Sequence, residues 1–129
     1  MRGLILAVLI FMNTSFASIV FKPSKEVYRK GENVCFYIKN NTNKEIILPS
    51  SAPWVVFEND KLLFAPVATQ QIVKIKPKQK KKWCWNQKDF DKNEILSGEY
   101  TIRLTVFENG KRKFLTFKVK IQPNYSDAQ

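Results

Sequence analysis

The chain has 129 residues and a formal net charge of +11, because 22 lysines and arginines stand against only 11 acidic residues. It contains no histidine, which excludes a Ser-His-Asp hydrolase and any metal site built on imidazole ligands. A chain of this size corresponds to one domain, whose core needs no metal to form. The positive charge favours anionic partners such as acidic polymers, membrane surfaces or nucleic acid. Solubility and ion-pair networks, as in heat-adapted proteins, are the simpler explanation of the same charge.

Residues 1–17 have the pattern of a secretory signal peptide. A positive start at Arg2 precedes an apolar run over residues 4–12, and Ser15-Phe16-Ala17 provides the small residues that a signal peptidase reads. The alternative, a membrane anchor, requires about 20 apolar residues, and this run is shorter. We therefore expect a mature chain that begins at Ser18, does not span a membrane, and is secreted or held in the cell envelope or periplasm.

Short segments with alternating apolar residues fill the rest of the chain, and turn residues separate them. Asn109-Gly110 is the strongest hairpin signal, and Asn59-Asp60-Lys61 is a second one. The pattern predicts an all-β fold, a single antiparallel immunoglobulin-like β-sandwich of about eight strands over residues 18–122, with a polar tail at 123–129. The predicted strands are 19–21 and 26–28, taken as two pieces of one edge strand, then 34–39, 44–48, 54–58, 62–64, 71–76, 80–86, 99–108 and 112–121.

The stretch Lys82-Trp83-Cys84-Trp85-Asn86 organises the expected core. In a strand, alternation places Trp83 and Trp85 on one face and Cys84 on the other, and the two indoles are best buried. The residues around Cys35 alternate in the same way, with apolar side chains opposite the cysteine. Export provides an oxidising compartment, so we predict a Cys35–Cys84 disulfide between neighbouring strands, across the outer face of one sheet. The alternative is a bridge through the core, which leaves both tryptophans exposed.

Two loops are candidates for a protein-binding site. A loop with a proline at each end is stiff, and one such loop follows the predicted strand 44–48. A longer polar connection, residues 87–97, follows the tryptophan stretch and is the second candidate. Both are alternatively plain connections between strands. The residues of the first loop are Pro49, Ser50, Ser51, Ala52 and Pro53.

A basic segment between residues 74 and 82 is a third candidate site. On a hairpin made of residues 71–86, several of its lysines would share the outer face and could hold phosphate or an acidic glycan. No exposed aromatic residues alternate with them, so nucleic-acid binding is not expected. The candidate basic residues are Lys74, Lys76, Lys78, Lys80, Lys81 and Lys82.

Three short motifs give weaker signals. Residues 89–93 have the oxygen spacing that starts a calcium loop, but Glu94 replaces the glycine that such a loop needs, so a polar loop is the better interpretation. Asn40-Asn41-Thr42 fits the glycosylation sequon. Ser97-Gly98-Glu99-Tyr100 resembles the tyrosine corner of immunoglobulin-like sandwiches, although Tyr100 is equally well explained as a half-buried strand residue. The sequence predicts no catalytic residue, metal or cofactor.

Several strand motifs together resemble a known family. They are Gly31-Glu32-x-Val34-x-Phe36-x-Ile38-x-Asn40-Asn41, a hydrophobic hairpin around 54–64, Pro77 followed by Trp83-x-Trp85-Asn86-Gln87, and Ser97-Gly98-Glu99-Tyr100-Thr101-Ile102. Their order, over residues 27–104, is similar to that of the BsuPI-type intracellular proteinase inhibitor domain. The resemblance implies a β-sandwich and, for the founding member, inhibition of a serine proteinase. The chain departs from the family in its leader, its cysteine pair and its lysine-rich segment.

These observations lead us to expect a secreted, non-enzymatic binding domain. The first hypothesis is a proteinase inhibitor of the BsuPI type, which holds its partner proteinase with the loop 49–53 or, second, with residues 87–97. The alternative is a structural or adhesion module of the cell envelope that binds an anionic polymer through a lysine-rich face. An enzyme is not expected, because the sequence has no histidine and no paired acid cluster.

Overall fold

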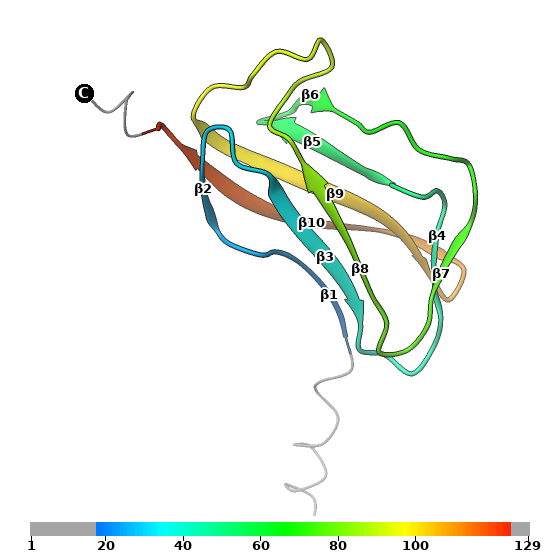
Figure 1. Cartoon of the computed structure of the whole chain (residues 1–129). Coiled ribbons are helices and arrows are strands. Elements are labelled where there is room, and N and C mark those ends of the chain that lie inside the picture. The colour runs from blue at the N-terminus through cyan, green and yellow to red at the C-terminus, as the bar shows by residue number, and fades with distance from the viewer. Residues whose placement is uncertain (1–17, 125–129) are drawn as a thin grey trace, which may run out of the picture.

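The computed structural model describes residues 18–124, and these residues form an all-β fold (Figure 1). The predicted signal peptide, residues 1–17, and residues 125–129 of the predicted tail lie outside the described residues. Within the described residues there are strands but no helix, and every predicted segment corresponds to a strand. The strands are β1 (Ile19–Pro23), β2 (Val27–Arg29), β3 (Val34–Asn40), β4 (Ile46–Leu48), β5 (Trp54–Glu58), β6 (Lys61–Phe64), β7 (Val73–Ile75), β8 (Lys80–Trp85), β9 (Gly98–Glu108) and β10 (Lys111–Gln122).

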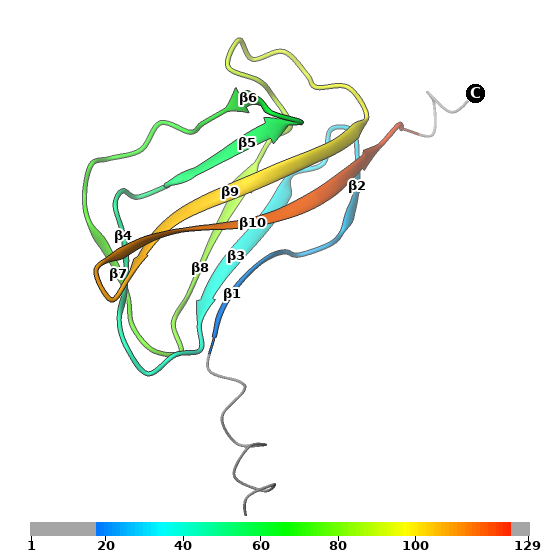
Figure 2. The same cartoon turned by 180° about the vertical axis from the view of Figure 1, so that it is seen from behind.

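The strands form two sheets that pack face to face, as the predicted β-sandwich requires. The smaller sheet has the order β1-β3-β8, and it lies in front in Figure 1. The larger sheet has the order β2-β10-β9-β4-β7, with β5 also paired to β9 and β6 paired to β5. Figure 2 shows the molecule from the other side, with β9 and β10 of the larger sheet in front. The pairing of β2 with β10 is parallel, and the other strand pairs are antiparallel.

The sequence predicted that the first two strands are pieces of one edge strand. This prediction is wrong, because the two strands lie in different sheets. β1 pairs with β3 of the smaller sheet, whereas β2 pairs with β10 of the larger sheet. The chain crosses over after Pro23, whose missing N–H is tolerated because β1 is an edge strand. Tyr28 explains the crossing, since it is only 2% exposed and its hydroxyl donates to the Cys35 carbonyl at 3.1 Å. Burial of this ring therefore ties β2 to the core.

Phe36 of β3 lies at the centre of the core between the two sheets. Its ring packs edge-on against Trp54 of the larger sheet, with a centroid distance of 5.0 Å, and at a tilt against Phe117, with a centroid distance of 5.5 Å. Phe21 of β1 contacts the same ring at 5.8 Å. Aromatic pairs of this kind contribute about 0.5–1.5 kcal/mol each beyond the area that they bury. The inner faces thus hold the sheets together, and the outer faces are left for other roles.

The tryptophan strand and the cysteine pair match their prediction. Cys35 of β3 lies directly opposite Cys84 of β8, and the two residues form a disulfide with a Cα–Cα distance of 4.0 Å. Trp85 is only 1% exposed, and Trp83 packs half-buried against the core. The bridge therefore joins adjacent strands on the outer face of the smaller sheet, and the alternative bridge through the core is excluded.

The corner at Tyr100 and both predicted hairpin turns are also present. The Tyr100 hydroxyl donates to the Leu96 carbonyl, and the ring is 1% exposed, so the tyrosine corner is confirmed. Asn59 and Asn109 adopt positive φ angles of 54° and 53°, which asparagine tolerates better than most residues. Gly110 follows at a φ of 76°, as a tight hairpin turn requires.

Residues 71–86 do not form one hairpin, in contrast to the prediction. β7 pairs with β4 of the larger sheet, whereas β8 pairs with β3 of the smaller sheet. The buried Asn40 explains this crossing, because its side-chain Nδ2 donates to the Ile75 carbonyl at 2.9 Å and to the Lys44 carbonyl at 2.7 Å. Its backbone carbonyl accepts from the Lys78 N–H at 2.7 Å. Asn40 thus satisfies backbone groups of the crossing chain, and its amide is too buried to accept a glycan in the folded domain.

Candidate functional site

The outer face of the smaller sheet gathers four lysines around one tyrosine. Strand register places Lys22 of β1 and Lys82 of β8 on either side of Tyr37 in β3. In the next row along the strands, Lys39 of β3 lies opposite Lys80 of β8. Tyr37 and Lys39 alternate with the buried residues of β3, so their side chains point outward. We call this surface the lysine face, and its members are Lys22, Tyr37, Lys39, Lys80 and Lys82.

Tyr37 positions one of these charges. The Lys80 ammonium lies over the Tyr37 ring, 4.0 Å from its centroid. A cation over an aromatic face is attracted by the ring quadrupole, by about 0.5–1 kcal/mol at exposed sites. The contact leaves the ammonium protons free to donate, because a ring face satisfies charge without occupying every N–H. Lys80 is therefore held over the Tyr37 ring with its hydrogen-bonding capacity largely unused.

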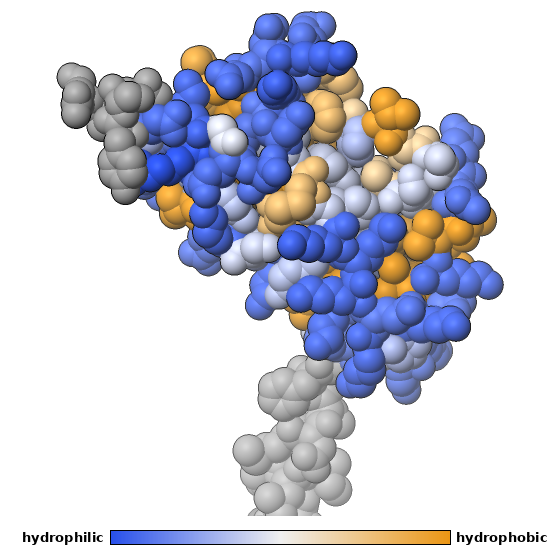
Figure 3. Space-filling model, in the orientation of Figure 1, coloured by the Kyte–Doolittle hydropathy of each residue, from blue (hydrophilic) through white to orange (hydrophobic). Residues whose placement is uncertain are grey.

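No carboxylate neutralises the lysine face within the described residues. The sequences of β1, β3 and β8 contain no acidic residue. The ion pairs within residues 18–124 lie elsewhere, between other lysines and glutamates. Figure 3 looks onto this side of the molecule, and hydrophilic residues cover it toward the lower ends of β3 and β8. Four positive charges on a flat sheet surface thus repel one another and favour an anionic partner.

The structure separates the six lysines that the sequence grouped together. Lys80 and Lys82 are on the lysine face, but Lys81 points to the inner side, with its ammonium 5.6 Å from the Trp83 ring centroid. Lys74 belongs to the larger sheet and lies 4.0 Å from a Glu45 oxygen. The remaining two, Lys76 and Lys78, are in the turn that joins the two sheets.

Sequence reasoning missed the other half of the lysine face. Lys22 and Lys39 come from β1 and β3, and they reach the face only through pairing with distant strands. For Lys39 a signal was available, since it alternates with the apolar residues of β3 in the same way as Cys35. For Lys22 there was none, because the sequence does not show which strand pairs with β1.

The loop 49–53 is packed against a neighbouring segment instead of standing free. Ser51 exchanges two hydrogen bonds with Thr69, one from the Ser51 N–H at 3.1 Å and one to the Ser51 Oγ at 2.9 Å. Its carbonyl accepts from Trp83 Nε1 at 3.0 Å. Pro49 is exposed, but the other residues of the loop are half-buried. A groove of about 420 Å³ lies between this loop and the segment that follows β6.

The loop 87–97 is more exposed and is also internally bonded. The Asp89 Oδ1 atom accepts from the backbone N–H groups of Asp91 and Asn93, both at 2.9 Å, so the oxygen spacing that resembled a calcium loop closes a turn. The loop is fixed at its start by the buried Gln87 and near its end by the buried Ile95. Among residues 18–124 no group of three or more acidic or cysteine side chains could hold a metal ion.

Large apolar side chains stand out from this loop. Phe90 is 54% exposed and Leu96 is 72% exposed. Phe90 lies near the β5–β6 hairpin, with its ring 5.9 Å from that of Phe64. A stiff loop with exposed apolar side chains is a surface that a protein partner could contact.

Two groups outside the lysine face have shifted pKa values. A hydrogen bond from Lys25 and one from the Arg29 N–H lower the pKa of Glu32. Burial raises the pKa of Tyr100, and the negative charge of Glu58 adds to this shift. Both groups accept or donate hydrogen bonds in turns at the end of the sandwich. Residues 18–124 contain no helix with the length and hydrophobicity needed to span a membrane.

The chain is similar to known proteins in fold, and not in sequence. No family model matches the chain, and no curated protein matches it. The native form of α-2-macroglobulin from E. coli matches 81% of this chain with 14% identity and a TM-score of 0.50. A chain of the complex of the SafA pilin with the SafB chaperone from Salmonella enterica matches 87% with 13% identity and a TM-score of 0.47. A β-glucosidase from Listeria innocua matches 85% with 14% identity and a TM-score of 0.42.

The chain spans only part of each of these structures. It covers 7% of the macroglobulin, 57% of the matched chain of the pilin–chaperone complex and 16% of the glucosidase. Sequence identities this low concern the fold alone, since unrelated functions share the β-sandwich architecture.

Proposed function

We propose that this protein is a non-enzymatic binding domain that works outside the cytoplasm and holds an anionic polymer on its lysine face. The observation that carries the proposal is the cluster of Lys22, Lys39, Lys80 and Lys82 around Tyr37, with no carboxylate partner in the described part of the chain. The Cys35–Cys84 disulfide supports the location, because such bonds persist mainly in oxidising compartments. A leader at residues 1–17 would direct the chain there.

The geometry of the face suits a polymer better than a single anion. Neighbouring strands lie about 4.8 Å apart, and same-face residues along a strand about 7 Å apart, so the four ammonium groups form a grid on the order of 10 Å across. A chain with closely spaced sulfate, phosphate or carboxylate groups can contact several of them at once. A monovalent anion contacts one, and exposed pairs of that kind contribute about 0–1 kcal/mol.

The test measures heparin binding at low salt with a charge-matched pair of variants. One variant replaces Lys22, Lys39, Lys80 and Lys82 by glutamine. The control replaces four exposed lysines scattered over other surfaces, namely Lys61, Lys92, Lys111 and Lys120.

We expect the face variant to lose at least about tenfold in affinity and the control to lose much less, since local contacts release counterions more effectively than net charge does. Equal losses of affinity in the two variants would mean that heparin binding depends only on the total charge, and this would contradict the proposal. Absence of binding by the unaltered protein at low salt would also contradict the proposal.

We also propose that the sandwich is of the immunoglobulin-like class and related to the BsuPI-type domain. The tyrosine corner at Tyr100 and the Cys35-bearing strand facing the tryptophan strand support this assignment. It brings a second candidate function, inhibition of a proteinase. The exposed and internally bonded loop 87–97 favours that function, because a stiff loop loses little conformational entropy on binding. The half-buried loop 49–53 is less suited to enter an active-site cleft.

Inhibition is tested by incubating the protein with a panel of subtilisin-like and papain-like proteinases. An inhibitor that uses the loop 87–97 should lose potency when Phe90 is replaced by alanine, because this exposed ring is the largest contact that the loop offers. No inhibition at about micromolar concentration across the panel would remove this second function.

A further inference from the structure

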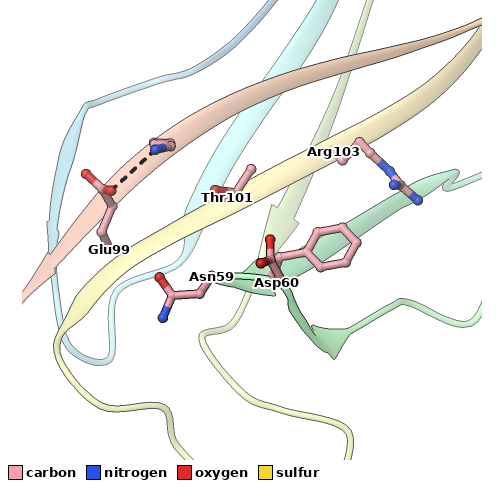
Figure 4. Close-up of a pocket in the computed structure, with 7 residues that line it drawn as sticks. Asn59, Asp60, Glu99, Thr101 and Arg103 are labelled. Atoms are coloured by element: carbon pink, nitrogen blue, oxygen red, sulfur yellow. Dashed lines mark ion pairs between the residues drawn. The ribbon is translucent and has the colours of Figure 1, made fainter.

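The outer face of the larger sheet contains a groove that neither proposed function uses. It has a volume of about 520 Å³, within the range of about 300–1,000 Å³ that small-molecule sites occupy. In Figure 4, Thr101 of β9 lies between Glu99 and Arg103, and the turn residues Asn59 and Asp60 face them from the β5–β6 hairpin. This groove lies on the side of the sandwich opposite to the lysine face.

The charges in the groove balance one another, unlike those of the chain as a whole. Asp60 and Glu99 supply two carboxylates, and Arg103 and Lys118 supply two cations. The Glu99 carboxylate and the Lys118 ammonium form an ion pair at 3.7 Å. A chain with a net charge of +11 thus has a locally neutral groove that is rich in donors and acceptors. An anionic ligand would meet the two carboxylates, and a cationic ligand would meet the two cations.

Arg103 is held in a fixed orientation at one end of the groove. Its guanidinium lies over the rings of Phe57 and Phe114, at 5.1 Å and 4.3 Å from their centroids. Its Nε atom is buried and has no hydrogen-bond partner within the described residues. A guanidinium stacked between two rings loses little side-chain freedom when it donates to a ligand. Phe57 also lines the groove and offers it a flat apolar surface.

From this arrangement we propose that the groove binds a neutral polyhydroxylated ring, such as a pyranose unit of a saccharide. Each sugar hydroxyl can accept from Arg103 or Lys118 and donate to Asp60 or Glu99, so one functional group satisfies both kinds of partner. Thr101 and Asn59 can do both as well. The C–H face of the ring would lie on Phe57, as apolar faces pack on aromatic side chains. The inference is independent of the anionic polymer proposed for the lysine face.

The experiment is an NMR titration of the ¹⁵N-labelled protein with four trisaccharides, each up to about 10 mM, a range that detects dissociation constants near 1 mM. Three probes are neutral, namely maltotriose, cellotriose and tri-N-acetylchitotriose, and trigalacturonate is the anionic comparator. We expect at least one neutral probe to shift the backbone amides of Thr101 and Arg103 in a saturable way. Trigalacturonate should shift them less.

Two matched variants locate the site. Thr101→Val removes one hydroxyl with little change in shape and should weaken binding about tenfold, the effect of one lost hydrogen bond that leaves its partner unsatisfied. Thr116→Val makes the same change at an exposed position of β10, outside the groove lining, and should bind like the unaltered protein. The proposal is overturned if no neutral probe shifts these amides, if trigalacturonate binds more tightly, or if Thr101→Val binds unchanged. Heparin binding plays no part in these outcomes.

Discussion

The two outer faces of the sandwich carry positive charge in opposite ways. On the larger sheet, Lys74 lies near Glu45 and Lys118 lies near Glu99. Arg103 of the same sheet is stacked on aromatic rings. On the smaller sheet, the lysine face has a cation–π contact at Tyr37 but no carboxylate partner among the described residues. The same net charge can therefore be neutralised locally or left available to a partner.

This difference separates charge that is neutralised locally from charge that is available to an anionic partner. Exposed ion pairs contribute about 0–1 kcal/mol to stability, so the paired lysines add little to the fold and offer little to a polyanion. Unpaired lysines that lie close together raise the local potential and give a polyanion several contacts at once. The arrangement of the lysines, and not their number, distinguishes the two faces.

Removal of the disulfide should have the largest effect on stability and almost none on polymer binding. The bridge between Cys35 and Cys84 spans 49 residues of sequence, and it should contribute about 2–4 kcal/mol by restricting the unfolded chain. The double variant C35A/C84A should lose this amount in urea unfolding. Heparin affinity of the folded variant should stay within about twofold, because Lys82 and Tyr37 keep their places through strand pairing. A folded variant that no longer binds would show that the face depends on the covalent bridge.

Substitution of one stacked cation on each face sharpens the comparison. Arg103→Met should cost about 1–2 kcal/mol in unfolding free energy, because the guanidinium packs on two rings and its stem covers apolar surface. Lys80→Met should cost less, about 0.5 kcal/mol, since it contacts one ring at an exposed site. Only the second change should weaken heparin binding. Thermal and urea unfolding of both variants, with the heparin assay, provide the check. The reverse order of costs would contradict the tighter packing of Arg103.

The Tyr100 corner, at the start of β9 in the larger sheet, should give a smaller and pH-dependent effect. Tyr100→Phe removes the hydroxyl that donates to the Leu96 carbonyl and should cost about 1 kcal/mol near neutral pH. Because burial raises the pKa of Tyr100, the neutral phenol is favoured in the folded state. Its contribution is complete below the ordinary tyrosine pKa and is lost as the pH rises through the folded value. Stability measured from pH 8 to pH 11 should therefore fall more steeply for the unaltered protein than for Tyr100→Phe. Parallel curves would rule out this contribution.

The sequence predicted those features that depend on local patterns. Alternation around Cys35 and Cys84 was sufficient to predict which face carries each sulfur, and the expected export of the chain supplied the redox condition. The corner at Tyr100 and the turn at Asn109-Gly110 depend on short motifs with known backbone requirements. All of these are decided within a few residues of sequence.

The features that the sequence did not predict depend on pairing between distant strands. The sequence predicts one edge strand in place of β1 and β2, because no local pattern shows that Tyr28 enters the core beside β10. The pattern of residues 71–86 predicts a hairpin, because the role of the buried Asn40 in the crossing is not visible in the sequence. The lysine face and the neutral groove both depend on register, so they became visible only in the structure.

Polyanion binding by the lysine face is tested most directly by mapping which lysines a bound polyanion protects from chemical modification. The folded protein is acetylated briefly at low salt, with and without a heparin-derived oligosaccharide, and the modified residues are identified by mass spectrometry. We predict that Lys22, Lys39, Lys80 and Lys82 are protected together, while Lys61 and Lys111 react as before. We also predict that the protection disappears as salt is raised, since exposed charges are screened. Protection spread evenly over all exposed lysines, or confined to the larger sheet, would contradict polyanion binding by the lysine face.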